Sequence, residues 1–336
     1  MMAFAAHAKA AEDLTLCKEA LALFGQNLER EQVPLLTRCI ETGDLRPENR
    51  AAALINRGYA LNAIHQYPRA ITDLDEAIQL QPKSAEPYNY RGRAKAFMGD
   101  DAGAMADLDK AIQLDPNYAA AYANRGLANE AEARHEKAIV DLDQALKMDG
   151  EQSEALLYRG IAKRYLGRFD GALEDLNHAL KLDPEAPNGY THRGWTLFGL
   201  QRYPLAVTDF RAALERDPDN PYKLLHLAIA LAREGGDVHA EIAERAKPIS
   251  PNDWPAPLIF FTLGRTSEDV ALSAAREGPA DEMQERALDA YFFLGMYRLV
   301  QGDRAGAIDF LQKSLESKKE RLLEYRQAKL ELSRLK

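Results

Sequence analysis

The sequence predicts an all-α fold in which helical hairpins stack into a solenoid, followed by an irregular helical carboxyl-terminal region. Five consecutive blocks of 34 residues repeat one pattern without a gap across residues 51–220. Within each block, apolar residues recur at spacings of three and four, which indicates two helices. A hairpin of this size cannot bury its own apolar face, so neighbouring blocks must stack to complete the core.

Small residues recur at fixed places in these blocks. Glycine occupies the eighth position and alanine the twentieth and twenty-seventh, as in Gly58, Ala70 and Ala77 of the first block. Small side chains let the two helices of a hairpin approach closely, where larger ones would separate their axes. Proline then stops the second helix near the end of four blocks. These prolines are Pro82, Pro116, Pro184 and Pro218.

The repeated pattern of glycine, alanine and proline resembles the tetratricopeptide repeat. The resemblance covers 170 residues and implies a right-handed superhelix whose first helices line a concave groove. In this repeat class, ligands usually contact the second, fifth, sixth, ninth, twelfth and thirteenth positions of a block. The candidate protein-binding residues at these positions are Tyr59, Asn89, Arg93, Asn124, Leu127, Arg164, Tyr165, His192, Trp195 and Phe198.

The composition of this candidate groove suits a peptide or protein ligand. Aromatic side chains with arginine and asparagine supply rigid apolar area and a few oriented polar groups. The alternative is that aromatic residues of these first helices, such as Tyr90, Phe97 and Tyr158, only pack between repeats, as most aromatic stripes at helical spacing do.

Each block also carries an arginine before its glycine and an aspartate at the twenty-third position. We predict a ladder of paired side chains that joins helices within or between repeats, because bidentate arginine–carboxylate pairs fix geometry well. The alternative is a stripe of arginines that binds anions. The ladder residues are Arg57, Arg91, Arg125, Arg159 and Arg193, with Asp73, Asp107, Asp141, Asp175 and Asp209.

The amino-terminal part predicts a degenerate capping hairpin at residues 11–50, with helices near 11–24 and 31–42. Before it, residues 1–10 read MMAFAAHAKA, a short apolar run that ends in the small-x-small sequence Ala8-Lys9-Ala10. This is the form of a secretory cleavage site, so residues 1–10 are a candidate remnant of a signal peptide. The alternative is an alanine-rich helix end.

The two cysteines are expected to lie side by side in the capping hairpin. Cys17 and Cys39 are each 11 residues from the turn near residue 28. At about 1.5 Å per residue, both would lie about 16 Å along an antiparallel pair of helices. A disulfide is therefore geometrically possible and would suit an oxidising compartment. The alternative is two buried thiols in a cytosolic protein.

After Pro218 the period breaks, and residues 221–287 predict an irregular helical region. Helices are expected at 221–233, 254–263 and 267–276, and glycines and prolines interrupt the chain between the first two. Residues 288–336 predict a further repeat with a carboxyl-terminal capping helix. The expected helices of this part are 281–301, 305–317 and 321–335.

The carboxyl-terminal part resembles the NlpI-type bacterial repeat lipoproteins. The segments that carry the resemblance are Asp217–Tyr222, Trp254 ahead of Ile259-Phe260-Phe261, Tyr291–Tyr297, and Glu324-Tyr325. Members of that family are outer-membrane-anchored dimeric adaptors that bring a periplasmic protease to cell-wall hydrolases. The resemblance therefore implies a homodimer and a periplasmic protease or cell-wall hydrolase as partner.

Composition and motifs argue against other classes of function. The net charge is −9, with 43 basic and 52 acidic residues, whereas nucleic-acid binding needs a basic face. No apolar run approaches the length of a transmembrane helix. We find no catalytic constellation, no glycine-rich phosphate loop and no metal-ligand spacing, so we expect a non-enzymatic protein without cofactor or metal.

Two functional hypotheses follow from the sequence. The first is a periplasmic or secreted adaptor whose groove holds a protein or peptide partner, while the carboxyl-terminal region serves dimerisation or a second partner. The second is a cytoplasmic scaffold within a regulatory or secretion assembly.

Overall fold

The computed structural model describes residues 15–23, 28–41, 45–186 and 188–335. All regular elements among these residues are helices, as the sequence predicts. The candidate signal remnant at residues 1–10 lies outside the described residues. The chain forms two compact units. Unit 1 holds the described residues up to Asn129 together with Val140–Gly150, and unit 2 holds Glu130–Ile139 and the described residues from Glu151 onward.

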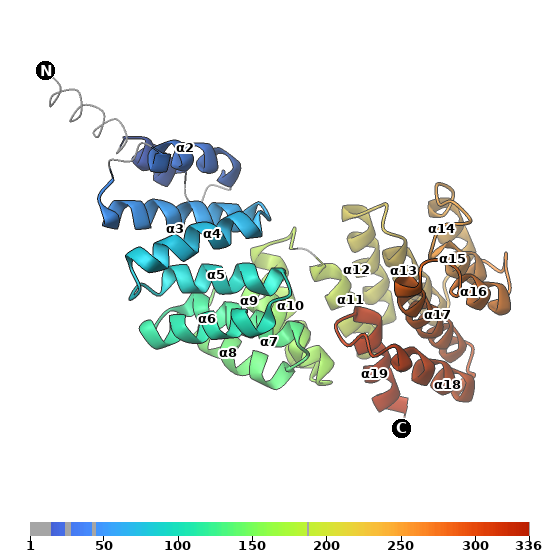
Figure 1. The fold of residues 1–336 in the computed structure, drawn as a ribbon. Helices are drawn as coiled ribbons and strands as arrows, with labels where there is room; N and C mark the ends of the chain where they lie inside the picture. The colour runs from blue at the N-terminus through green and yellow to red at the C-terminus, as the bar shows by residue number, and fades with distance from the viewer. Residues whose placement is uncertain (1–14, 24–27, 42–44, 187, 336) are drawn as a thin grey trace, which may run out of the picture. The chain divides into compact units, whose positions relative to one another are not determined.

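Unit 1 is built from stacked helical hairpins (Figure 1). A helical segment at residues 15–22 precedes the other helices. Helix α3 packs against α2, α4 and α5, and α5 packs against α4 and α6, so each hairpin contacts the next. The helices are α2 (Glu29–Glu41), α3 (Pro47–Ala63), α4 (Tyr67–Leu80), α5 (Glu86–Phe97) and α6 (Asp101–Leu114), followed by α7 (Ala119–Ala131) and α8 (His135–Met148), whose residues are divided between the two units.

The recurrent small residues hold the two helices of each hairpin together. A Cβ atom on Gly58 would lie 2.7 Å from Cγ of Leu74, a distance at which the leucine would have to move. A Cβ on Gly92 would likewise lie 2.8 Å from Cγ of Leu108. The leucine at the twenty-fourth position therefore fills the space that the glycine at the eighth leaves open.

Unit 2 contains the last two regular blocks and the carboxyl-terminal region. Its core is aromatic, and the fully buried Trp195, Phe210 and Phe292 pack together with leucines of α13. The helices are α9 (Ser153–Tyr165), α10 (Phe169–Leu182), α11 (Gly189–Gly199), α12 (Tyr203–Arg216), α13 (Pro221–Glu234), α14 (Val238–Arg245), α15 (Ala256–Thr262), α16 (Glu268–Ala274), α17 (Ala280–Val300), α18 (Arg304–Ser314), the 3₁₀ turn η1 (Leu315–Ser317) and α19 (Leu323–Leu335).

The carboxyl-terminal region agrees with the sequence expectation except at α14. That helix lies where the glycines and prolines predict an interruption, and it begins because the side chain of Asp237 accepts a hydrogen bond from the backbone of Ala240. Helices α17 and α18 form a repeat-like hairpin, in which a Cβ on Gly295 would lie 3.2 Å from Cγ of Leu311.

Candidate protein-binding surfaces

The ladder arginines are each paired with the aspartate sixteen residues later. Arg57 donates to both carboxylate oxygens of Asp73, from Nε and Nη2, at 2.7 Å each. Arg193 and Asp209 repeat this geometry in unit 2, also at 2.7 Å. The other three pairs are Arg91–Asp107, Arg125–Asp141 and Arg159–Asp175.

Some ladder arginines also link consecutive repeats. Nη1 of Arg91 donates to Asp75, on the second helix of the preceding block, at 2.5 Å. Nη1 of Arg125 does the same to Asp109 at 2.7 Å. Hydrogen bonding to Asp107 and Asp141 raises the pKa of the two guanidinium groups. These side chains are thus engaged in structural pairs, which leaves the anion-binding alternative without support.

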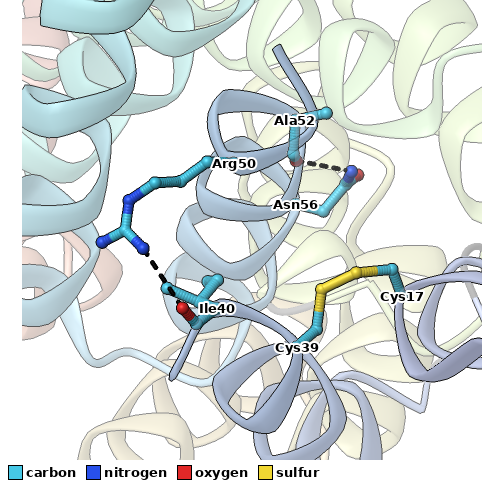
Figure 2. Close-up of a disulfide and its surroundings, with 6 residues drawn as sticks. All are labelled: Cys17, Cys39, Ile40, Arg50, Ala52 and Asn56. Atoms are coloured by element: carbon cyan, nitrogen blue, oxygen red, sulfur yellow. Dashed lines mark hydrogen bonds between the residues drawn. A yellow bond between two sulfur atoms is a disulfide. The ribbon is translucent and has the colours of Figure 1, made fainter. Parts of the chain in front are cut away.

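The two cysteines form a disulfide between the first helical segment and α2 (Figure 2). Their Cα atoms lie 5.5 Å apart, and Cys39 is fully buried. Next to the disulfide, Arg50 of α3 donates to the carbonyl oxygen of Ile40 at 3.1 Å, which ties α3 to the end of α2. The disulfide therefore links the two helical segments of the capping hairpin at the start of unit 1.

The first helices of unit 1 bring several of the predicted groove residues together. Nη1 of Arg93 donates to Oδ1 of Asn124 at 3.1 Å, and Nδ2 of Asn124 donates to Oδ1 of Asn89 at 2.8 Å. Tyr67, at the start of the second helix α4, stacks on Phe97 of α5 with ring centres 5.2 Å apart, and the Arg93 guanidinium lies 5.6 Å from the Phe97 ring centre. We call Tyr59, Tyr67, Arg93, Phe97 and Leu127 the unit 1 face.

Exposure separates the predicted residues of unit 1 into two groups. Asn89 is fully buried and Asn124 is 8% exposed, so both position neighbouring side chains. Phe97 is 52% exposed, while Tyr59, Arg93 and Leu127 are half-buried. Tyr59 packs on Tyr90, with ring centres 5.3 Å apart. Tyr90 thus packs between two repeats, as the alternative interpretation of these aromatic residues predicts.

The corresponding helices of unit 2 are covered by α19. Arg326 of α19 donates to Glu130 at 2.8 Å and to the backbone oxygen of Ala131 at 2.6 Å. Gln327 accepts a hydrogen bond from Arg164 of α9, and Arg334 donates to the backbone oxygen of Gly199 at 2.8 Å. We call Glu130, Arg164, Tyr165 and His192, with the backbone of Ala131 and Gly199, the unit 2 face.

Two residues predicted to line the groove are core residues instead. Trp195 is 1% exposed and packs against Phe210, His226 and Phe292, and Phe198 is 4% exposed. Phe292 comes from α17, so the carboxyl-terminal region encloses the indole ring. A ligand cannot reach either side chain in this arrangement, so the prediction that Trp195 and Phe198 line the groove is wrong.

The unit 2 face is a desolvated cluster of charged and titratable groups. Burial lowers the pKa of His135 to about 4, with Arg326 and Arg164 acting in the same direction. Burial likewise holds the pKa of His192 well below its usual value. Burial raises the pKa of Glu130, and Arg326 opposes that shift. Burial and the guanidinium groups of Arg164 and Arg326 thus both disfavour the charged forms of His192, in the face, and of the neighbouring His135.

The part of α19 that contacts this face is not evident from sequence. Arg326 and Gln327 precede the buried Glu331 on the same helix, while Ala328 and Leu332 pack into the core. The only sequence signal is that α19 has a second, polar stripe, which a solvent-exposed capping helix would also have.

Within the described residues, no group of three or more histidine, cysteine, aspartate or glutamate side chains is arranged to hold a metal ion. Across the same residues, none of the helices has both the length and the apolar character needed to span a membrane.

Family models match the repeats directly. A model described as tetratricopeptide repeat matches residues 141–187, 157–221 and 191–253, and a second of that description matches residues 119–152. A TPR repeat model matches residues 98–132. The chain is a tetratricopeptide-repeat protein.

Solved structures resemble this tetratricopeptide-repeat protein in fold. PilF of Pseudomonas aeruginosa is 20% identical, with a TM-score of 0.54 over 62% of this chain and 96% of its own. PilW, described as a type IV pilus biogenesis factor, is 18% identical, with a TM-score of 0.53 over 60% of this chain and 94% of its own. A chain of the Cut9–Hcn1 complex is 15% identical, with a TM-score of 0.55 over 95% of this chain and 55% of its own. Curated proteins give no match.

Proposed function

We propose that this protein is a non-enzymatic scaffold that binds a protein partner through the first helices of its repeats. The observation that carries the proposal is the position of α19. In unit 2, Arg164 of α9 and the backbone of α11 hold a polypeptide helix by hydrogen bonds. The first-helix face of these repeats is therefore able to bind a polypeptide, and an equivalent face is present in unit 1.

The unit 1 face has the chemistry of a peptide-binding surface. The Tyr67–Phe97 stack offers rigid apolar area, and the positive charge of the Arg93 guanidinium beside it attracts a carboxylate. The Asn89–Asn124 pair keeps Arg93 in place through the bond to Oδ1 of Asn124. We infer a ligand segment with an apolar side chain on the stack and an acidic one at Arg93.

The finer proposal is a periplasmic or secreted adaptor whose partner is a periplasmic protease or a cell-wall hydrolase. Two observations support it: the disulfide, which suits an oxidising compartment, and the resemblance of the carboxyl-terminal part to the NlpI-type lipoproteins. That resemblance also suggests a homodimer, which sedimentation velocity tests. The rival is a cytoplasmic scaffold. Thiol titration of protein from its native host decides between them, because two free thiols favour the cytoplasm and blocked thiols favour export.

Affinity capture from the native host tests the binding role. The wild-type chain is compared with Arg93→Ala/Phe97→Ala, which removes the guanidinium and the exposed ring together. The control is Val140→Ala, since Val140 is also in unit 1 and is 68% exposed but lies on a second helix. We expect the double variant to lose partners that the control keeps. An unchanged partner list for the double variant would show that the unit 1 face is not the site.

A further inference from the structure

The unit 2 face contains a buried arginine, Arg164, that no carboxylate of the described residues contacts directly, although Glu130 and Glu331 interact with it electrostatically at longer range. Arg164 is fully buried, and its Nη1 donates to the amide oxygen of Gln327, while Nη2 lies 3.5 Å from Nδ1 of His192. Among the described residues, no carboxylate lies within ion-pair distance of Arg164, and its Nε has no hydrogen-bond partner. This differs from the ladder arginines, each of which has a bidentate aspartate.

Helix α19 therefore satisfies only part of the hydrogen-bonding capacity of the unit 2 face. A buried guanidinium is costly to desolvate, and a carboxylate in bidentate geometry is the group that offsets the cost best. Gln327 presents one neutral oxygen instead. The buried Nε of Arg164 is thus a donor of the unit 2 face that α19 does not use.

The contacts that hold the polar side of α19 lie partly at the rim. Arg321 pairs with Glu132, and its side chain is 54% exposed. Arg334 bonds to the backbone of Gly199, and its side chain is 29% exposed. The chain before α19 leaves η1 through Lys318, whose φ of 55° ends the helix. Release of α19 from the unit 2 face would break these exposed pairs, and it would also break the buried Arg326–Glu130 pair and the packing of Ala328 and Leu332, which a displacing helix must replace.

We propose that the unit 2 face is a second protein-binding site, whose partner is a helical segment with a glutamate in the place of Gln327, and that this segment binds by displacing α19. The partner also carries a basic residue one position earlier, where Arg326 meets Glu130. Its carboxylate pairs with Nε and Nη1 of Arg164. This inference rests on the proposed protein-binding role of the first helices.

Two synthetic peptides test the proposal. The first covers residues 321–335, which are α19 and the two residues before it, and the second exchanges two residues, Gln327→Glu and Glu331→Gln. The exchange leaves the composition and the net charge of the peptide unchanged. One of the two positions still carries an amide and the other a carboxylate, as in the structure, where Gln327 and Glu331 share a hydrogen bond at 2.9 Å. Each peptide is labelled with fluorescein and titrated with full-length protein, and anisotropy is measured.

We expect the exchanged peptide to bind at least 10-fold more tightly than the α19 peptide. The full-length variant Arg321→Ala/Arg334→Ala, which weakens the hold on its own α19, is expected to bind both peptides more tightly and to keep the ratio. Arg164→Lys is expected to reduce the ratio to about 1, since an ammonium lacks the bidentate fork. Equal binding of the peptides by the weakened variant, or no binding of either, would overturn the proposal.

Hydrogen exchange gives a readout that does not depend on an Arg164 variant that folds. Addition of the exchanged peptide to the wild-type chain should deprotect the amides of α19 and leave those of α5 and α6 unchanged. Binding without deprotection of α19 would place the peptide elsewhere and refute displacement. If neither peptide binds while affinity capture of partners still depends on Arg93 and Phe97, only the inference about the unit 2 face is wrong. If, in addition, capture does not depend on Arg93 and Phe97, the proposed function is wrong as well.

Discussion

The first helices of the repeats in unit 1 and in unit 2 share one sequence pattern but have different surroundings in the structure. In unit 1, Tyr59 at the ninth position of its block is half-buried and belongs to a partly exposed aromatic surface. In unit 2, Trp195 at the ninth position of its block is 1% exposed and enclosed by Phe292 of α17. The ladder pairs have the same geometry in both units.

The repeat pattern thus determines how the helices pack, but not whether the predicted ligand-facing side of the first helices is exposed or covered. Gly58 and Gly194 both leave space for the residue sixteen positions later, a leucine in one case and a phenylalanine in the other. What differs is the carboxyl-terminal region, which closes over α9 and α11. A tandem array can thus bury the ninth position of one block and leave that of another partly exposed.

The largest expected difference between the units comes from truncating the residue at the ninth position. Trp195→Ala should lower the free energy of unfolding by about 3–5 kcal/mol, because it empties the centre of the aromatic core. Tyr59→Ala should cost about 1 kcal/mol, since the ring loses one aromatic contact and part of its burial. Urea denaturation followed by circular dichroism measures both. Losses of equal size would contradict the assignment of one residue to a core and the other to a surface.

Removing the disulfide should destabilise unit 1 alone. The bond closes a loop with a sequence separation of 22, for which loss of chain entropy in the unfolded state corresponds to about 3 kcal/mol. Cys17→Ser is preferred to a change at Cys39, because Cys39 is fully buried and its loss would leave a cavity. Hydrogen exchange should rise in α2 and α3 and stay constant in α17 and α18. Faster exchange in α17 would show that the capping hairpin stabilises more than its own unit.

The scaffold could be predicted from sequence because the evidence for it is repeated. The spacing of Gly58 and Leu74 recurs in each block, and the arginine and aspartate of the ladder recur with it, so close packing and pairing follow from a pattern rather than from one residue. That Cys17 and Cys39 could form a disulfide followed from their equal distance from one turn, whereas the sequence left two free thiols open as the alternative. All these inferences concern neighbours within a hairpin or between adjacent hairpins.

The covering of the unit 2 face could not be predicted in the same way. The bond from Arg164 to Gln327 joins residues 163 positions apart, and no periodicity links them. Trp195 occupies a ligand-facing position of its block, and only the placement of Phe292 makes it a core residue. Contacts of this kind depend on how an irregular region folds back, which a local pattern does not encode.

A smaller effect concerns Asp289, a buried carboxylate of α17 in unit 2. Asp289 accepts hydrogen bonds from Tyr222 and Trp254, and burial, with Glu324 of α19 nearby, raises its pKa to about 7. The folded chain therefore binds more protons at Asp289 than the unfolded chain does between about pH 4 and pH 7. The stabilising contribution of this carboxyl group is complete below that window and is lost as the pH rises through it.

Comparison with Asp289→Asn isolates this contribution, because asparagine keeps an acceptor for both donors. Between pH 5 and pH 7, the wild type should lose about 2 kcal/mol of stability relative to the variant. The difference between the two proteins is the relevant quantity, since His135, whose pKa is lowered to about 4, changes stability in the opposite direction below about pH 6.5. Asp269→Asn, an exposed control, should follow the wild type. Parallel curves for wild type and Asp289→Asn would contradict the role of Asp289.

The smallest expected effect is one that should be the same in both units. Double-mutant cycles of Arg57→Met with Asp73→Asn, and of Arg193→Met with Asp209→Asn, measure the coupling of one ladder pair in each unit. We expect about 1 kcal/mol for each cycle, because the aspartates are buried while the arginines keep 15% and 23% exposure, which moderates the interaction. Additive losses in both cycles would mean that the bidentate geometry contributes nothing to stability. Coupling in unit 2 alone would mean that the covering of the first helices, and not the repeat itself, makes the ladder pair stabilising. The two cycles therefore decide whether the ladder pairs of the two units, which have the same geometry, also have the same coupling energy.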